Sequence, residues 1–337
     1  MKYNYIFFNS EDGNTRKRNP DGYYTICTKD LETMDGVHLV SYPLDYACTP
    51  TRYLFYLHHY PKINKVLNLP LKKLWYPYYF KNPFPDDKPL CFVVSGTYLP
   101  IDYLRYLKRK YPNCKMVRIH RDLIGLWKVQ CPQYTPEVNQ EIFDLRLTID
   151  ELEAKKYGIE HFVEFESKID VPRSPNYPMS DVFFAGRAKD RLPKLMEIYH
   201  RLTARGLMVS YFLLGVPESD RKPFLGIEYA DRGMKYREML NRTVNTRCLL
   251  EINQEGQVGF TSRFLEAVMY NKKLITDNPA VKNTRFYDPR LIQFLDRAED
   301  VDPSFVLDET DVDYHYHNEF SPVNLIHQID SLLADRF

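Results

Sequence analysis

The 337-residue sequence has no excess of either charge, no long hydrophobic run and few cysteines. Lys and Arg number 46 against 45 Asp and Glu, so the net charge is +1. We expect no nucleic-acid partner, because such proteins need surplus cations to neutralise phosphates. No apolar run approaches the roughly 18 residues of a membrane-spanning helix. Residues 1–9 carry too short an apolar stretch for a signal peptide, and we expect a cytosolic protein.

Several common motifs are also absent. Gly-x-Gly-x-x-Gly, Gly-x-x-x-x-Gly-Lys and Gly-x-Ser-x-Gly do not occur, which removes the sequence support for a dinucleotide fingerprint, a P-loop or a nucleophile elbow. The cysteines form no Cys-x-x-Cys pair, so we expect reduced structural thiols and no disulfide framework or zinc site. They are Cys27, Cys48, Cys91, Cys114, Cys131 and Cys248.

Short apolar or β-branched runs alternate with longer amphipathic runs, the pattern of an α/β protein. The pattern predicts strands at residues 5–8, 37–41, 90–95, 114–119, 144–148, 181–185, 208–214, 246–252 and 273–276. It predicts helices at residues 100–111, 150–157, 191–205, 235–241, 262–271 and 322–336. Tyrosine is abundant, with 27 residues, and suits both carbohydrate-binding surfaces and half-buried sheets, so both interpretations stay open.

These elements predict two Rossmann-like, doubly wound α/β domains that face each other across a cleft. Residues 171–178 contain three prolines, cannot hold a helix or a central strand, and are expected to form the linker. The N-terminal domain would span residues 1–172 and the C-terminal domain residues 173–321. The amphipathic segment 322–337 needs a partner surface and is expected to cross back to the first domain.

Two segments of the second half carry candidate chemistry. In the first, a buried strand runs into Gly186 and then into Arg187 and Lys189, ahead of a helix. Open α/β sheets bind ligands at the carboxyl ends of their strands, where such cations suit phosphate oxygens. The alternative is that the cations are solvated loop charges, and the pattern does not separate the two.

In the second segment, the strand predicted at 246–252 leads into a polar loop with two glycines and then into a helix capped by Thr261 or Ser262. Glycines allow a ligand close to the backbone, and the free amides of a helix start attract a pyrophosphate. Glu266 lies off the apolar face of this helix, and we expect it to line a polar cleft, where it could accept bonds from ribose hydroxyls. It is equally well explained as a carboxylate favoured near a helix N-terminus.

Together these segments, over roughly residues 180 to 290, resemble the donor-binding domain of GT-B glycosyltransferases. The resemblance is to bacterial enzymes of surface-polysaccharide assembly, such as lipopolysaccharide and capsule. It implies that the strand-end loop contacts the phosphates, that the second loop wraps the pyrophosphate, and that Glu266 binds the ribose. The implied donor residues are Gly186, Arg187, Lys189, Gly259, Phe260, Thr261, Ser262, Arg263 and Glu266.

The catalytic candidates are His120, Asp122 and Glu255. Many retaining members of the family carry a Glu eight positions before the ribose Glu, where this chain has Val258; Glu255 lies three residues earlier. An inverting enzyme needs a base for the acceptor hydroxyl, and His120 or Asp122, at the end of a strand, has suitable chemistry. A strand-end salt-bridge cluster is the structural alternative.

The resemblance implies transfer of a sugar from a nucleotide-diphosphate sugar to a glycan or lipid-linked glycan, with no cofactor and no metal. Peripheral contact with the inner membrane face is expected from the family and from residues 71–76, which mix lysines with aromatics. Two alternatives remain. Asp300-Val301-Asp302 and Asp311-Val312-Asp313 match the Asp-x-Asp metal motif of GT-A glycosyltransferases. Asp311, Asp313, His315, His317 and Glu319 occupy every second position, which in a strand would aim all five side chains to one side. A non-catalytic nucleotide-sugar or glycan-binding protein is the other.

Overall fold

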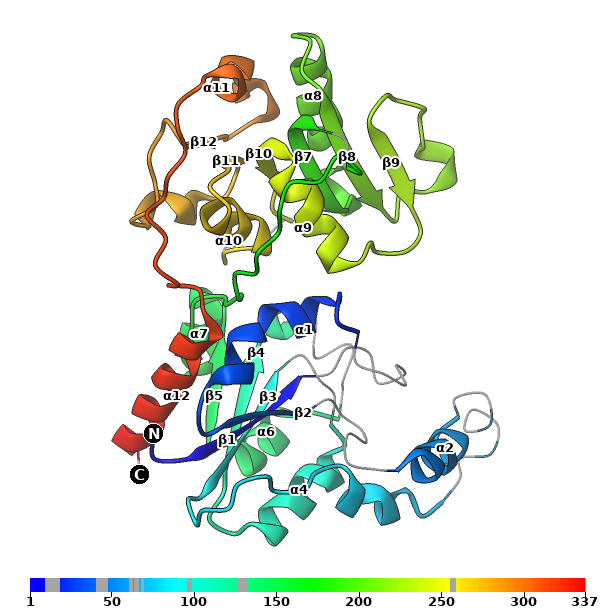
Figure 1. Cartoon of the computed structure of the whole chain (residues 1–337), viewed down its shortest axis with the longest axis vertical. Coiled ribbons are helices and arrows are strands. Elements are labelled where there is room, and N and C mark those ends of the chain that lie inside the picture. Colours follow the sequence, from blue (N-terminus) through cyan, green and yellow to red (C-terminus); the bar gives the residue numbers. More distant parts are fainter. Residues whose placement is uncertain are drawn as a thin grey trace. The chain divides into compact units, whose positions relative to one another are not determined.

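The computed structural model describes residues 1–9, 19–40, 48–60, 63, 67, 70–95, 99–125, 133–177, 179–254 and 259–336. The chain forms two compact units, each built on its own sheet (Figure 1). The first unit comprises Met1–Pro20, Thr28–Phe162 and Pro322–Phe337, and the second comprises Asp21–Cys27 and Val163–Ser321. The second unit therefore begins ten residues before the boundary predicted at 172/173, and it includes a short piece of the N-terminal half.

Hydrogen bonds explain why the segment after Phe162 belongs to the second unit. The side-chain amide of Asn245 donates to the carbonyls of Ser174 and Tyr177 at 2.7 and 2.8 Å. The Tyr270 hydroxyl donates to the Ile169 carbonyl at 3.1 Å. The predicted linker thus packs against this unit and turns at residues 175–176; its last proline, Pro178, falls outside the described residues.

Six parallel strands form the sheet of the first unit, in the order β2-β1-β3-β4-β5-β6. They are β1 (Asn4–Asn9), β2 (Val37–Val40), β3 (Leu90–Ser95), β4 (Lys115–His120), β5 (Leu145–Thr148) and β6 (Glu160–His161). The strand order reverses between β1 and β3, and Leu90–Ser95 matches its predicted bounds.

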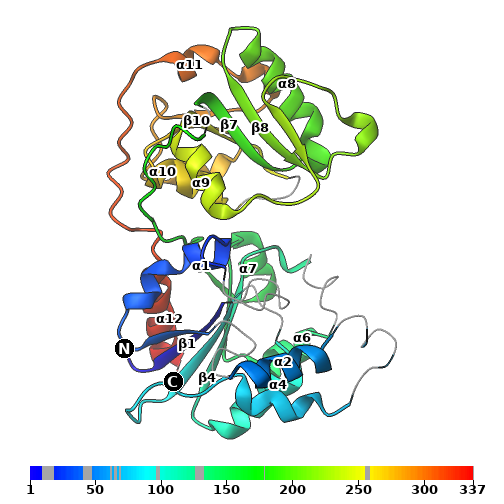
Figure 2. The same ribbon diagram turned by 45° about the vertical axis from the view of Figure 1, so that its right-hand side comes forward.

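Helices cover both faces of this sheet (Figure 2). They are α2 (Thr49–His58), α4 (Ile101–Lys110), α6 (Pro136–Ile142), α7 (Glu151–Tyr157) and the terminal α12 (Pro322–Arg336). Alternate strand residues point to opposite faces. Ile6 and Phe92 accordingly pack in one core with Leu104 of α4, while Tyr5 donates to Asp330 of α12 at 2.7 Å. The terminal helix packs on the first unit because its apolar stripe, including Ile326 and Ile329, is buried there.

The sheet of the second unit is also parallel, in the order β12-β11-β10-β7-β8-β9. Its strands are β7 (Ser180–Arg187), β8 (Val209–Leu214), β9 (Ile227–Ala230), β10 (Thr246–Glu251), β11 (Lys273–Thr276) and β12 (Ile292–Phe294). β7, β8 and β9 form one half of this sheet, and β10, β11 and β12 form the other half. This is the doubly wound order of a Rossmann sheet. The direction of winding reverses between β7 and β10.

The helices of the second unit also lie on both faces. They are α1 (Tyr23–Cys27), α8 (Leu192–Thr203), α9 (Tyr236–Val244), α10 (Ser262–Met269) and α11 (Pro303–Leu307). Leu195 of α8 packs against Val182, whereas Leu265 of α10 packs against Phe183 on the opposite face. No helix in the described ranges is long and apolar enough to cross a membrane.

Every predicted strand and helix is present, with ends shifted by three residues or fewer. The elements that sequence reasoning missed are short or lack a clean period: α1, α2, α6, α11, β6, β9 and β12. Two of them, β6 and β12, contain only two and three residues. A run of that length shows no alternation, so its pairing with the neighbouring strand becomes visible only in the folded sheet.

Candidate functional site

A cavity of about 230 Å³ lies in the second unit at the point where the strand order reverses. Ligands of open α/β sheets bind at such a switch point, at the carboxyl ends of the strands. The end of β7, the end of β10 and the start of α10 form the walls. The lining residues are Phe184, Ala185, Arg191, Glu251, Ile252, Gln254, Thr261, Ser262 and Arg263.

Arg191 supplies the cation at the β7 wall of this cavity. Its Nε donates to the Arg187 carbonyl at 3.0 Å, its Nη1 donates to the Ile252 carbonyl, and its guanidinium lies over the Phe184 ring at 5.2 Å. A Cβ on Gly186 would lie 2.9 Å from Nη2 of Arg191. The predicted Gly186 therefore leaves room for the guanidinium at the strand end.

The cations favoured by the sequence are Arg187, the last residue of β7, and Lys189, two residues later; neither lines the cavity. Both side chains are exposed. The Lys189 ammonium donates to the Gln254 side chain at 2.5 Å, and Lys189 adopts a left-handed backbone conformation with φ of 43°. These contacts place Lys189 beside the cavity, over the loop that follows β10.

Thr261 begins α10 and fixes the second wall of the cavity. Its hydroxyl accepts a bond from the Arg263 backbone N–H at 3.1 Å and donates to the Glu251 carboxylate. Glu251, at the end of β10, also accepts from the Thr276 hydroxyl at 2.5 Å. Burial raises the pKa of the Glu251 carboxyl, while the bonds from Thr261 and Thr276 lower it. Glu251 therefore orients the helix start through Thr261.

The predicted pyrophosphate loop divides between cavity and core. Thr261, Ser262 and Arg263 line the cavity, as expected for residues at a helix start. The Phe260 ring instead stacks on Phe264 at 4.8 Å, and the Gly259 carbonyl accepts from the Asn278 side chain at 3.1 Å. Phe260 and Gly259 thus contact the protein interior and do not line the cavity.

Glu266 does not lie in an open polar cleft; the structure corrects this expectation. Its side chain is 0% exposed and forms an ion pair with Arg263. It also accepts bonds from the Tyr236 hydroxyl at 2.9 Å and the Thr243 hydroxyl at 3.2 Å. Burial raises the pKa of the Glu266 carboxyl, and the Arg263 charge opposes that rise. For Glu266 to reach a ribose, the Arg263 side chain would have to move aside.

A second buried carboxylate lies behind Glu266. The Tyr236 hydroxyl contacts both Glu266 and Glu166, and Glu166 is 0% exposed. One hydroxyl carries one proton, so it cannot donate to two ionised carboxylates at once. Arg263 and Thr243 also donate to Glu266, so Glu266 keeps hydrogen-bond donors when the Tyr236 hydroxyl donates to Glu166.

A segment from the N-terminal half completes this side of the second unit. The Tyr23 hydroxyl lies 3.1 Å from the Ser262 hydroxyl, and its ring meets the Tyr236 ring edge-on at 4.9 Å. Arg237 forms an ion pair with Asp21 at 2.8 Å, which holds the same segment in place. Tyr23 and Ser262 are 239 residues apart, so no local pattern links them.

The electrostatics of the cavity favour an anion. Arg263 is neutralised by Glu266, but Arg191 forms no ion pair with a carboxylate within the described ranges. Burial lowers the pKa of Arg191, and the nearby charges of Asp190, Asp277 and Glu251 partly oppose that shift. The hydrogen bonds of its guanidinium go to backbone carbonyls. The amides of the first turn of α10 have no partners within the helix and add to the positive potential.

The remaining catalytic candidates lie elsewhere. His120 ends β4 in the first unit and is 6% exposed; Asp122 follows it and is exposed. Burial, with help from the charges of Arg118 and Arg146, lowers the pKa of His120 to about 3. His120 is therefore neutral at physiological pH and a weak base. Glu255 falls outside the described residues.

The lowered pKa of His120 predicts acid sensitivity of the first unit. The unfolded chain takes up a proton near the ordinary histidine pKa of about 6.5, whereas the folded chain takes it up only near 3. Stability is therefore complete above pH 6.5 and is lost as the pH falls from 6.5 towards 3, at about 1.4 kcal/mol per unit at most. His120→Gln should flatten this slope in denaturant titrations between pH 4 and 7. The exposed His327→Gln should leave the slope unchanged, and an unchanged slope in His120→Gln would contradict the prediction.

The Asp-x-Asp runs do not gather into a metal site. No group of three or more His, Cys, Asp and Glu side chains suited to a metal occurs in the described part of the chain. Residues 309–318 form no strand, and His315 has a left-handed φ of 49°, so the predicted alternation of Asp311, Asp313 and His315 to one side is wrong. His315 instead contacts Asp313 at 3.1 Å.

No protein-family model matches the chain, and no curated protein matches it. Among solved structures, it is similar to an α-glucosyltransferase in complex with UDP and a 13-mer DNA containing an HMU base. The identity is 11%, the TM-score is 0.55, and 97% of this chain and 98% of that chain are covered. It is also similar to a structure assigned as a UDP-N-acetylglucosamine 2-epimerase from Listeria monocytogenes. There the identity is 8%, the TM-score 0.53, and the coverage 99% and 97%. These likenesses confirm the predicted fold class, two Rossmann-like α/β domains of the GT-B type.

Proposed function

We propose that this chain is a GT-B glycosyltransferase that moves a sugar from a nucleotide-diphosphate sugar to a carbohydrate acceptor. The observation that supports this most strongly is the cavity at the switch point of the second sheet. It combines the Arg191 cation, which forms no ion pair with a carboxylate of the described residues, with the start of α10. A diphosphate carries the charge and size that such a wall accepts.

In this proposal the diphosphate lies between Arg191 and the first turn of α10. Arg187 and Lys189 add longer-range positive charge from the same loop, and Glu266 receives ribose hydroxyls once Arg263 moves. Bond cleavage leaves negative charge on the departing diphosphate, and preorganised cations and amides stabilise that charge. No metal ion or cofactor is needed for this step.

The acceptor would be a glycan or lipid-linked glycan of a bacterial surface polysaccharide, bound by the tyrosine-rich first unit. His120, Asp122 and Glu255 are the proposed catalytic groups. A base works best when its pKa lies near the working pH. The low pKa of His120 makes it a weak base, and the alternative is Asp122, which is exposed two residues beyond the end of β4. We place the enzyme in the cytoplasm, with peripheral contact to the inner membrane face.

A thermal-shift screen of nucleotide sugars tests the donor proposal. A donor at 100 times its Kd should raise the stability by about 2.7 kcal/mol. Donors that stabilise the chain are then incubated with candidate glycans, and release of the nucleoside diphosphate is followed by chromatography. Stabilisation with acceptor-dependent release supports the transferase. Stabilisation without product favours a nucleotide-sugar-binding protein, and no stabilisation by any donor contradicts the donor site.

Chelation separates the two classes of glycosyltransferase. We expect turnover to be unchanged, within about twofold, after dialysis against EDTA, because protein cations neutralise the leaving group. A GT-A enzyme would lose turnover almost completely and recover it with Mg²⁺ or Mn²⁺. Donor binding measured in the same samples shows whether any loss comes from the chemical step or from binding.

The two structural likenesses each raise one further outcome. One of them is assigned as an epimerase of a UDP-sugar, so the donor is also incubated without an acceptor and its sugar is followed by NMR. Conversion of the donor sugar under these conditions would show that the chain is an epimerase and not a transferase. The other holds DNA with a modified base, so such DNA belongs among the acceptors tested. The net charge of +1 argues against DNA, because it provides no cation surplus for the phosphates.

A further inference from the structure

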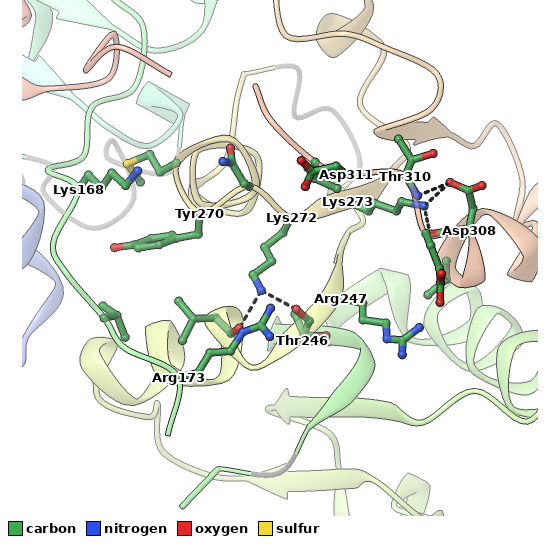
Figure 3. A pocket seen from close by; sticks show the side chains of 17 residues that line it. Lys168, Arg173, Thr246, Arg247, Tyr270, Lys272, Lys273, Asp308, Thr310 and Asp311 are labelled. Atoms are coloured by element: carbon green, nitrogen blue, oxygen red, sulfur yellow. Dashed lines mark hydrogen bonds and ion pairs between the residues drawn. The ribbon is translucent and has the colours of Figure 1, made fainter. Parts of the chain in front are cut away.

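A second and larger cavity, of about 750 Å³, lies at the opposite end of the second sheet (Figure 3). It opens beside Thr246 and Lys273, the first residues of β10 and β11, whereas the cavity described above lies beyond Glu251. Five steps along β10 at about 3.3 Å each separate the two ends by about 17 Å. The two cavities share no lining residue.

Lys272 forms the floor of this cavity. It is 6% exposed, and its ammonium donates to the carbonyls of Val244 and Thr246 at 2.7 Å each. An ammonium has three donors, so one remains for another acceptor. No carboxylate from the described segments forms an ion pair with Lys272, and Figure 3 shows its side chain directed towards Arg173 and away from Asp311.

The neighbouring cations of this wall are also without carboxylate partners. Arg173 is exposed and forms neither a hydrogen bond nor an ion pair with any residue that the structure describes; Lys168, also exposed, contacts only the Tyr316 ring, at 5.7 Å. The other two cations of the lining are paired, Lys273 with Asp308 at 3.1 Å and Arg247 with Asp181 at 3.5 Å. Three cations of the lining, Lys168, Arg173 and Lys272, thus form no ion pair with a carboxylate of the described residues.

This arrangement is costly for the protein alone. Burial and the nearby Arg173 charge lower the pKa of Lys272 to about 8, since no anion compensates the ammonium. Buried charges in proteins are normally paired. A bound anion would supply the missing charge, and the Arg fork and the Lys point charge are the groups that hold phosphate oxygens.

We propose that this cavity is a phosphate-binding site, in which Lys272 and Arg173 hold the phosphate and Lys168 lies at the rim. About 750 Å³ is the size of a pocket for a whole small molecule and exceeds what one inorganic ion fills. The ligand is therefore a phosphomonoester, whose organic part lies along Asn271 and Thr310. The site is separate from the donor cavity and does not depend on the proposed transferase activity.

Titration calorimetry with glucose 6-phosphate and with inorganic phosphate tests the proposal. We expect saturable binding of both, with the ester the tighter ligand, and a loss of about tenfold or more in Arg173→Gln. Arg205→Gln removes the same charge from an exposed position outside both cavities and should bind as the wild type does. Arg191→Gln should also keep this binding, which separates it from the donor site.

Proton uptake gives a readout independent of any substitution at Lys272. Sulfate does not titrate near pH 8, so any protons taken up when it binds go to groups of the protein. The number of protons is obtained by titrating sulfate in buffers that differ in ionisation enthalpy. Because an anion raises the pKa of Lys272, we expect net uptake between pH 8 and 9. Three results would overturn the proposal: no saturable phosphate binding, equal loss in Arg205→Gln, or binding without proton uptake. Equal affinity for phosphate and its ester would overturn the assignment of an ester.

Discussion

Replacing Glu266 with methionine is expected to lower the stability of the second unit by about 3–5 kcal/mol, because it leaves Arg263 buried without its counter-charge. The Thr243 hydroxyl loses its acceptor at the same time. For a unit of this size, such a loss lowers Tm by about 2–4 °C per kcal/mol. The measurement is thermal and urea unfolding of each variant, with the first unit as an internal reference.

A double-mutant cycle separates the ion pair from the cost of a changed shape. Arg263→Met alone should be as damaging as Glu266→Met, since it leaves an unpaired buried carboxylate. The double variant should recover much of the loss, because apolar replacements of a whole buried pair are often neutral. Losses that simply add in the double variant would show that Glu266 and Arg263 do not stabilise each other.

Replacing Arg191 with glutamine is expected to weaken binding of the nucleoside diphosphate about ten- to a hundredfold. A hydrogen bond to a charged group contributes roughly 1.5–3 kcal/mol, and the departing diphosphate loses this stabilisation too, so turnover should also fall. Arg187→Ala should have a smaller effect, because Arg187 is exposed and does not line the cavity. Calorimetric titration with UDP, and with other nucleoside diphosphates if UDP does not bind, measures both.

Arg205→Gln is the matched control for Arg191→Gln, since it removes the same charge from an exposed position of the same unit. Thermal melts of both variants show whether the hydrogen bonds from Arg191 to the Arg187 and Ile252 carbonyls matter for folding. Wild-type affinity in Arg191→Gln would remove Arg191 from the donor site. A larger loss in Arg187→Ala than in Arg191→Gln would show that the exposed loop cation makes the principal contact.

The fold was predictable because its signals are local. Residues 90–95 and 273–276 are short, mainly apolar runs between turn signals, and both strands match their predicted bounds. Helix 322–336 carries an apolar stripe over its whole length and also matches its predicted bounds. The parallel sheet follows from the alternation of such strands with helices. Strand order was not predictable, because the reversal at β7 and β10 depends on pairing between distant residues.

The candidate site was predicted at the level of segments but not of side chains. Sequence reasoning chose Arg187 and Lys189 at the strand end, whereas the cavity is lined by Arg191, four residues beyond Arg187, the last residue of β7. Which of these cations faces inward depends on the turn after Gly186. The burial of Glu266 depends on α9, which supplies Tyr236 and Thr243. Because both residues lie outside α10, the sequence pattern of α10 alone could not predict this burial.

Hydrogen–deuterium exchange with and without the nucleoside diphosphate tests the donor site most directly, because it reports on the backbone of every segment at once. We expect slower exchange in residues 185–191 and 259–266 when the diphosphate is bound, and no such change in the Arg191→Gln variant at the same concentration. Residues 271–273, beside the second cavity, serve as the reference segment. Binding that slows exchange only there, or only in the first unit, would contradict a donor site between Arg191 and the start of α10.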